Sequence, residues 1–290
     1  MRTYVKTYSV CVGNRACNAA CPFCVARMTG TAGTKYGPPP PIDSMRLRKG
    51  AELAKMLGAT TALLTGKGEP LMWPERLYET LDVVSEVFPL VEVQTNGIRL
   101  SGEVVDRLYG YGVTMVALSC VHYDTEANED CYGRNYPLTG LEGMIHLVHG
   151  KGISVRLTCM LCKGWIDSVE KVEDLIQWAA EHRVEQLTVR PIVKPEKSND
   201  AATTHWVAEH ELSQEQMHEI EWHIHERSTR LNTLVHGHVY AYPLGDGSEQ
   251  NVCVSDCLTR DASSNEIRQF IYCPDGHIRY DWVHDAAIVF

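Results

Sequence analysis

The stretch Cys17-Asn18-Ala19-Ala20-Cys21-Pro22-Phe23-Cys24 places three cysteines in the pattern C-x3-C-x2-C, directly after a predicted strand at residues 8–12. Three thiolates on a loop at the carboxyl end of a strand can each bind one iron of a cubane iron–sulfur cluster, which leaves the fourth iron open to another ligand. Zinc is the alternative metal, but a zinc site favours four protein ligands, and no His or Cys lies between Cys24 and Cys120. The stretch therefore favours an iron–sulfur cluster.

Short apolar strands alternate with amphipathic helices on the carboxyl side of this stretch. Further strands are predicted at residues 61–65, 91–94, 113–119, 153–159 and 186–190, and helices at 43–57, 74–87, 101–109, 141–149 and 167–179. Such alternation is typical of a parallel sheet with right-handed crossovers. Six strands are too few for a closed eight-stranded barrel. The sequence therefore predicts an α/β fold, an open partial (β/α)6 barrel with its site at the carboxyl ends of the strands.

The pattern changes after the sixth strand. Residues 191–204 read as a polar loop and residues 213–231 as a polar amphipathic helix. A hairpin is predicted from 267–273 and 277–282, around the turn Pro274-Asp275-Gly276. We therefore expect a barrel domain at 1–195 and, at 196–290, a C-terminal helix with a small β-rich cap.

Composition excludes several classes of protein. The 290 residues carry 27 basic and 37 acidic side chains, a net charge of −10 without any Lys/Arg run, so bulk nucleic acid is not an expected partner. No apolar stretch approaches the roughly 20 residues of a membrane span, and the first six residues are too polar for a secretory signal. We expect a soluble cytoplasmic protein, in which 11 cysteines indicate metal binding rather than disulfides.

Four motifs in order resemble those of the radical S-adenosylmethionine (SAM) superfamily. The first is the cysteine triad with Phe23 before its last cysteine. Gly66-Lys67-Gly68-Glu69-Pro70 follows the second predicted strand and is similar to the family's GGEP element, with Lys67 replacing the first glycine. Gln94-Thr95-Asn96-Gly97 ends the third strand and Ser119 the fourth. The resemblance covers residues 7–195.

The resemblance implies a set of cofactors and site residues. Cys17, Cys21 and Cys24 would hold a [4Fe–4S] cluster, and SAM would chelate its open iron. The implied SAM contacts are Phe23, Gly68, Glu69, Pro70, Thr95, Asn96, Ser119 and Arg156. Phe23 would border the adenine, the backbone of Gly68 to Pro70 would hold the methionine amino group, and the hydroxyls would bind the ribose or carboxylate. Arg156 would pair with the carboxylate or, alternatively, form an ordinary strand-end ion pair. Lys67 is expected to be solvated and without a role.

A second group of cysteines, Cys253, Cys257 and Cys273, has the spacing C-x3-C-x15-C. It resembles the auxiliary-cluster region of the twitch–SPASM branch, and the whole chain is similar to the molybdenum-cofactor GTP 3′,8-cyclases, which space these cysteines as C-x2-C-x13-C and end in Gly-Gly. Because both features differ here, GTP is not the expected substrate. A second iron–sulfur cluster, a zinc site that includes His277, and no metal remain open for this group. The other cysteines are expected to be mainly structural: Cys11, Cys120, Cys131, Cys159 and Cys162.

The resemblance implies an enzyme that accepts an electron from a reductant such as flavodoxin or ferredoxin, cleaves SAM and abstracts hydrogen through a 5′-deoxyadenosyl radical. Our leading expectation is a small-molecule or nucleotide-like substrate that undergoes rearrangement, cyclisation or dehydrogenation. A peptide- or protein-modifying maturase is the alternative, although a first strand near residue 7 leaves no room for an added leader-binding domain. A non-catalytic electron carrier or sensor is a third hypothesis, which the SAM motifs argue against.

Overall fold

The structure is a computed structural model that describes residues 4–133, 139–234, 237–255 and 267–290. The chain forms two compact units, each built from discontinuous segments. The first unit contains residues 1–18, 29–116 and 258–290, and the second contains residues 19–28 and 117–257. The predicted domain boundary near residue 195 follows a different division and stays a prediction.

The first unit has a sheet in the order β11-β10-β1-β2-β3. Its strands are β1 (Thr7–Cys11), β2 (Thr61–Thr65), β3 (Leu90–Thr95), β10 (Gln269–Tyr272) and β11 (Ile278–Arg279). Four of them are parallel, because β10 pairs with β1 in the register Thr7 to Gln269, whereas β11 is antiparallel to β10. The predicted C-terminal hairpin is confirmed. Its first strand also extends the parallel sheet, which the sequence did not indicate.

The three α-helices of the first unit begin where the sequence predicts them, and a short 3-10 turn that was not predicted precedes the second of them. They are α2 (Ser44–Met56), the 3-10 turn η1 (Pro70–Met72), α3 (Pro74–Val84) and α4 (Gly102–Gly110). The Asp43 carboxylate accepts a hydrogen bond from the Arg46 amide at 3.0 Å and caps α2. The Ser101 hydroxyl caps α4 in the same way through the amide of Val104. Gly58 follows the C-cap of α2 and has φ +108°, a backbone conformation that favours glycine and ends the helix.

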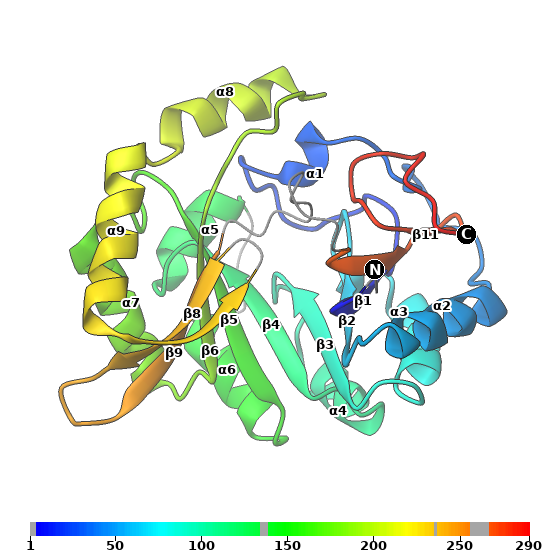
Figure 1. Cartoon of the computed structure of the whole chain (residues 1–290), viewed down its shortest axis with the longest axis horizontal. Helices are drawn as coiled ribbons and strands as arrows, with labels where there is room; N and C mark the ends of the chain where they lie inside the picture. The colour runs from blue at the N-terminus through cyan, green and yellow to red at the C-terminus, as the bar shows by residue number, and fades with distance from the viewer. Residues whose placement is uncertain (1–3, 134–138, 235–236, 256–266) are drawn as a thin grey trace. The chain divides into compact units, whose positions relative to one another are not determined.

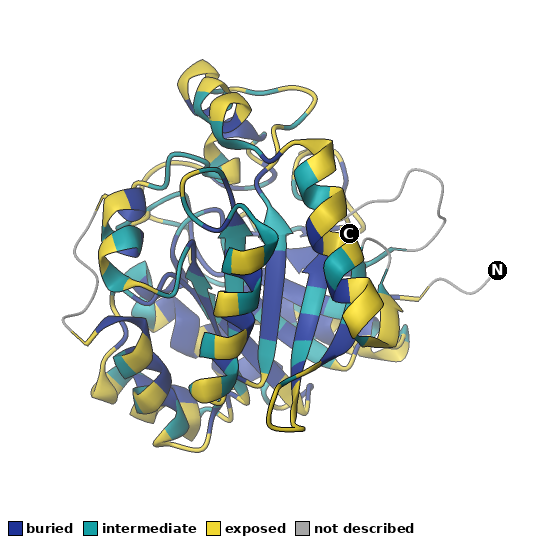
Figure 2. Cartoon of the chain, turned by 90° about the vertical axis from the view of Figure 1, so that its left-hand side faces the viewer, coloured by how far each residue is buried: buried dark blue, intermediate teal, exposed yellow. Residues whose placement is uncertain are grey.

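The second unit has its strands in the order β5-β6-β9-β8-β7. They are β5 (Ser154–Leu161), β6 (Gln186–Pro191), β7 (Thr229–Leu234), β8 (Gly237–Pro243) and β9 (Glu249–Ser255), while β4 (Met115–Cys120) begins at the end of the first unit. Strands β5, β6 and β9 are parallel, and β7-β8-β9 form a small antiparallel region. The helices are α1 (Val25–Met28), α5 (Thr125–Tyr132), α6 (Gly140–His149), α7 (Val169–Glu181), α8 (Ala201–His210) and α9 (Gln214–Arg227). Figure 2 shows helices with exposed outer residues in front of strands that are mostly buried or half-buried, whereas β7 is exposed along most of its length.

Three predictions about helices in the second unit are wrong in detail. The loop predicted at 191–204 contains the start of α8, which Asp200 caps through the Thr203 amide and which buries Val207. The helix predicted to reach residue 231 ends at Arg227, and residues Thr229–Leu234 form β7.

The helix predicted from residue 167 begins later than expected, because α7 starts at Val169. The N-cap of α7 is Ser168, whose hydroxyl accepts from the Lys171 amide, and not Asp167. Asp167 instead accepts hydrogen bonds from the Gly164 amide and the Lys171 ammonium.

The predicted fold class is confirmed. The chain is mixed α/β, with parallel strands typical of the predicted partial barrel and a small C-terminal antiparallel region (Figure 1). Within the described ranges, no helix has the length and apolar character that a membrane crossing requires.

Candidate active site

The cysteines of the triad differ from most other described cysteines in their exposure. Cys17 is exposed, and Cys21 and Cys24 are half-buried. Helix α1 begins directly after Cys24, whose amide donates a 3.2 Å hydrogen bond to the Cys21 carbonyl. Three accessible thiols within eight residues match, in number and sequence spacing, the ligands of three irons of a cubane cluster. Cys17 belongs to the first unit, and Cys21 and Cys24 belong to the second.

The buried cysteines lie in apolar surroundings, as the sequence predicts for structural positions. Cys11, Cys120, Cys131, Cys159 and Cys162 are all buried. Burial raises the pKa of the Cys11 thiol to about 11 and that of the Cys162 thiol to about 12. A thiol that stays protonated at neutral pH is a poor metal ligand, since ligation requires the thiolate.

The segment Gly68-Glu69 in the first unit lies against the residues that precede the first cysteine. The Glu69 amide donates a 2.9 Å hydrogen bond to the carbonyl oxygen of Ala16. A Cβ atom on Gly68 would lie 2.2 Å from that same oxygen and 2.7 Å from the carbonyl oxygen of Asn14. Only glycine permits this approach, so the second motif is packed directly onto the start of the cysteine loop.

The carboxylate of Glu69 joins the second motif to the third. It accepts hydrogen bonds from the Thr95 hydroxyl at 2.7 Å, the Asn96 amide at 2.9 Å and the Leu71 amide at 3.0 Å. Burial raises the pKa of Glu69 above its ordinary value, although these three donors act in the opposite direction. Glu69, predicted as a SAM contact through its backbone, therefore also cross-links two strand ends.

Asn96 connects this network to the cysteine loop. Its side-chain amide donates to Asn18 Oδ1 at 2.8 Å and lies 3.7 Å from the sulfur of Cys17. The Thr95 hydroxyl, predicted to bind the ribose or carboxylate of SAM, is buried, donates to Glu69 and accepts from the Gly97 amide at 3.0 Å. The arrangement favours a positioning role for Thr95 and leaves Asn96 beside the predicted cluster ligand.

Lys67 was expected to be solvated, and the structure contradicts this. Only 7% of the residue is exposed, and its ammonium donates to the carbonyl oxygen of Gly30. Arg15 binds the same loop, donating to the carbonyl oxygens of Thr29 at 3.0 Å and Gly30 at 2.8 Å. Sequence reasoning missed both cations as members of the site. The available signal was a charged residue between two glycines at a strand end.

The buried Lys67 ammonium predicts a pH dependence of stability. Burial, with a smaller contribution from Arg15, lowers the pKa of Lys67 from 10.5 to about 8. Between these values the unfolded chain binds more protons than the folded one, so this residue makes stability rise with pH. Relative to Lys67→Met, wild-type apoprotein should gain up to about 1.4 kcal/mol per pH unit between pH 8 and 10.5. Urea unfolding across this range measures the difference, and parallel curves for the two proteins would contradict the assignment.

The predicted site residues of the second unit lie on separate elements. The Phe23 ring lies 6.1 Å from the ring of Trp206 on α8 and 6.5 Å from that of Tyr132. Ser119 is half-buried on β4. Arg156 on β5 donates a 2.9 Å hydrogen bond to Gln186 Oε1, its register partner on β6. Trp206 was missed because α8 was not predicted.

The described C-terminal cysteines lie in different units. Cys253 is half-buried on β9 in the second unit, whereas Cys273 follows β10 in the first and is buried, and Cys257 lies outside the described residues. The Cys273 sulfur interacts with Arg279 and the Ile271 carbonyl, and burial raises the pKa of this thiol to about 12. Within the described part of the chain, no three His, Cys, Asp or Glu side chains are grouped to hold a metal ion. A second cluster stays a prediction, and the surroundings of Cys273 favour a structural role.

Comparison with known protein families agrees with these motifs. The profile described as the Radical SAM superfamily matches residues 12–202, about two thirds of the 290 residues. The chain belongs to the radical SAM superfamily. It is therefore an enzyme of the class that uses a [4Fe–4S] cluster and SAM. No curated protein matches the sequence significantly.

Several solved structures of radical SAM enzymes share the fold. SuiB from Streptococcus suis bound to S-adenosylmethionine aligns with a TM-score of 0.59 and 13% identity, over 95% of this chain and 60% of SuiB. The enzyme anSMEcpe with bound AdoMet aligns with a TM-score of 0.62 and 14% identity, over 98% of this chain and 76% of the other. Methylornithine synthase (PylB) aligns with a TM-score of 0.52 and 16% identity, over 68% of this chain and 56% of the other. At these identities the likeness shows the fold alone, and this radical SAM chain spans about three fifths of the SuiB length.

Proposed function

We propose that the chain binds a [4Fe–4S] cluster through Cys17, Cys21 and Cys24 and cleaves SAM reductively to abstract hydrogen from a peptide or protein side chain. The observation that carries the SAM-binding part is the buried Glu69 carboxylate, which holds Thr95 and Asn96 while the Asn96 amide lies 3.7 Å from Cys17. These hydrogen bonds support a fixed distance between the cysteine loop, the Gly66–Pro70 motif and the Gln94–Gly97 motif, which are distant in the sequence.

The chain's own residues supply binding and orientation in this proposal. When bound, the cluster and SAM supply the electron and the 5′-deoxyadenosyl group that removes hydrogen. The backbone of Gly68 to Pro70 would bind the methionine amino group, and Asn96 would orient polar atoms beside Cys17. The remaining proposed SAM contacts are Phe23, Pro70, Ser119 and Arg156. The proposed electron donor is a flavodoxin- or ferredoxin-type protein.

The peptide substrate is proposed on the similarity to two enzymes whose structures include peptides. SuiB has been solved bound to its precursor peptide SuiA, at a TM-score of 0.61. The enzyme anSMEcpe has been solved with AdoMet and the Kp18Cys peptide, also at a TM-score of 0.61. A small-molecule or nucleotide-like substrate, our leading expectation from the sequence, is the second candidate. Methylornithine synthase, with a TM-score of 0.52, supports it less strongly.

The SAM-cleaving part is tested first. Anaerobically reconstituted protein, reduced with dithionite and given SAM, should produce 5′-deoxyadenosine and methionine in chromatographic analysis. Absence of 5′-deoxyadenosine from cluster-loaded protein would contradict the proposed enzyme activity and favour an electron carrier or sensor.

Deuterium transfer then separates the two substrate classes. The reaction is run with a perdeuterated tryptic peptide mixture in one arm and perdeuterated ribonucleotides in the other. Deuterium in 5′-deoxyadenosine from the peptide arm alone is the expected result. Transfer from the nucleotide arm alone would show that the peptide assignment is wrong.

A further inference from the structure

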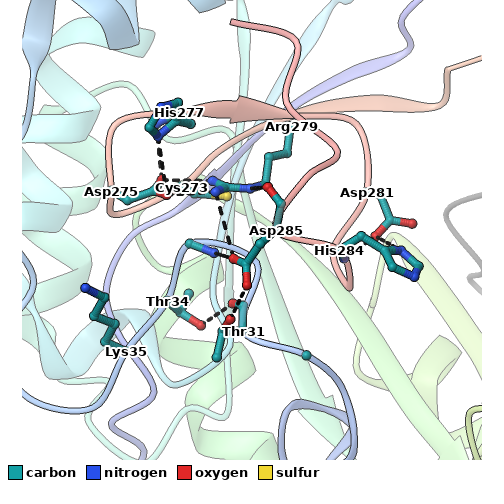
Figure 3. A network of polar contacts seen from close by, with 12 residues as sticks. Thr31, Thr34, Lys35, Cys273, Asp275, His277, Arg279, Asp281, His284 and Asp285 are labelled. Carbon is teal, nitrogen blue, oxygen red and sulfur yellow. Dashed lines mark hydrogen bonds and ion pairs between the residues drawn. The ribbon is translucent and has the colours of Figure 1, made fainter. Parts of the chain in front are cut away.

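In the first unit, the loop of residues 29–35 is held by the segment after β10, residues 273–290, which we call the C-terminal tail. The Asp285 carboxylate accepts a 2.6 Å hydrogen bond from the Thr31 hydroxyl and a 2.7 Å hydrogen bond from the Gly33 amide (Figure 3). These contacts join residues separated by more than 250 positions in the chain. One side chain thus fixes both the backbone and a side chain of this loop.

Two glycines allow the loop to lie directly on the tail. A Cβ atom on Gly30 would lie 2.4 Å from the carbonyl oxygen of Val283, and one on Gly33 would lie 2.5 Å from Arg279 Nη1. Gly33 has φ +77° and the buried Ala32 before it has φ +40°, so the loop passes through two left-handed conformations. A positive φ is unfavourable for alanine, and the surrounding contacts must therefore hold it in place.

The tail itself is fixed by Arg279, a buried residue of β11. Its guanidinium donates to both carboxylate oxygens of Asp275, at 2.8 Å and 2.7 Å, and its Nε donates to the Asp285 carbonyl oxygen at 3.0 Å (Figure 3). Paired bonds of this kind are strong and directional. Asp285 is therefore presented to the loop from a rigid support.

The other side of the loop binds the two cations that sequence reasoning missed. Carbonyl oxygens of Thr29 and Gly30 accept hydrogen bonds from Arg15, and Gly30 also accepts one from Lys67. Arg15 lies two residues before Cys17, and Lys67 immediately precedes Gly68. The loop is thus the common acceptor for the residues that lead into the first and second SAM motifs.

We infer that Asp285 is a positioning residue for SAM binding: by holding loop 29–35, it fixes Arg15 and Lys67 and through them the backbone at Cys17 and at Gly68-Glu69. The inference rests on the proposed SAM-dependent function. In this role the C-terminal tail acts through the hydrogen bonds of Asp285 and Arg279 and not as a ligand of a second metal cluster.

The matched variants are Asp285→Ala and Asp281→Ala. Asp281 belongs to the same tail and is 5% exposed, and its carboxylate accepts from the amides of Val283 and His284 within its own turn. In cluster-loaded protein, Asp285→Ala should raise the SAM dissociation constant about tenfold, a change of about 1.4 kcal/mol. Its iron content should stay at the wild-type value, and Asp281→Ala should bind SAM within about twofold of wild type. Equilibrium dialysis with labelled SAM measures all three proteins.

A second readout uses protein without cluster or SAM. Hydrogen exchange at the amides of residues 30–34 should accelerate in Asp285→Ala and not in Asp281→Ala. Thr31→Val removes one exposed hydrogen bond to Asp285 and should also weaken SAM binding. In the double variant it should add little to the effect of Asp285→Ala. If Asp285→Ala takes up no cluster, Thr31→Val is tested in its place.

Two outcomes would overturn the positioning role. Unchanged SAM affinity in Asp285→Ala would exclude it, and equal weakening by Asp281→Ala would attribute the effect to general loosening of the tail. Failure of wild-type, cluster-loaded protein to bind SAM would instead reject the proposed function on which the inference rests.

Discussion

Replacing Cys17, Cys21 and Cys24 with alanine should remove about four irons per chain and reduce 5′-deoxyadenosine formation to background. The three thiols are exposed or half-buried, so their removal leaves no cavity in the core and the apoprotein should keep the wild-type melting temperature. Iron and sulfide analysis, with product detection after dithionite reduction, measures the effect.

The matched control for this variant is Cys162→Ala. Cys162 is buried within a cluster of Met28, Ile192 and Val207, so its loss should lower stability by about 1 kcal/mol while the iron content and SAM cleavage persist. 5′-Deoxyadenosine produced by the triad variant would reject these cysteines as the cluster ligands. About four irons retained by that variant would instead reveal a second cluster, which the buried setting of Cys273 argues against.

Local signals in the sequence predicted most of the elements that position the site. The strand at 61–65 matches β2 at both ends, and the helix predicted from residue 43 begins there, with Asp43 as its N-cap. Both predictions depend on short-range patterns, namely apolar runs between turns and polar side chains at helix starts. These patterns were enough to predict the carboxyl ends of β1, β2 and β3, where the motifs lie.

Long-range pairing could not be predicted in the same way. Strand β10 pairs with β1 across about 260 residues, and nothing in its four residues Gln-Phe-Ile-Tyr distinguishes a parallel partner from a hairpin arm. The parallel pairing of β9 with β6 is also a long-range contact that short-range patterns do not predict. Helix α8 was missed because its apolar residues do not gather on one face, and only Thr203 and Val207 of the helix are buried.

The site was predicted as a set of motifs but not as a network. The motif similarity indicated Glu69, Thr95 and Asn96 separately, whereas the hydrogen bonds among them depend on the distance between two strand ends. Lys67 was misjudged because a lysine on a loop is usually solvated. Here its ammonium donates to the carbonyl oxygen of Gly30, which lies 37 residues away in the sequence.

Replacing Glu69 with alanine should both destabilise the first unit and abolish SAM binding. The change leaves the buried amides of Leu71 and Asn96 and the Thr95 hydroxyl without their acceptor. Each unsatisfied buried donor costs about 1–3 kcal/mol, so we expect the three together to cost at least about 3 kcal/mol. Asn96 would then lose its fixed position beside Cys17, and SAM affinity should fall at least about a hundredfold, which is near 3 kcal/mol.

Glu69→Gln and two substitutions at Thr95 separate the hydrogen bonds of Glu69 from its size. The glutamine amide has one accepting oxygen instead of two, and both Leu71 and Asn96 offer backbone donors, so one of these donors must lose its partner. Glu69→Gln should therefore weaken SAM binding and lower stability by about 1–3 kcal/mol, and Thr95→Val should act in the same direction. Thr95→Ser keeps the hydroxyl and should retain wild-type affinity. Wild-type SAM affinity and stability in Glu69→Gln would mean that the cross-link between the second and third motifs does not organise the site.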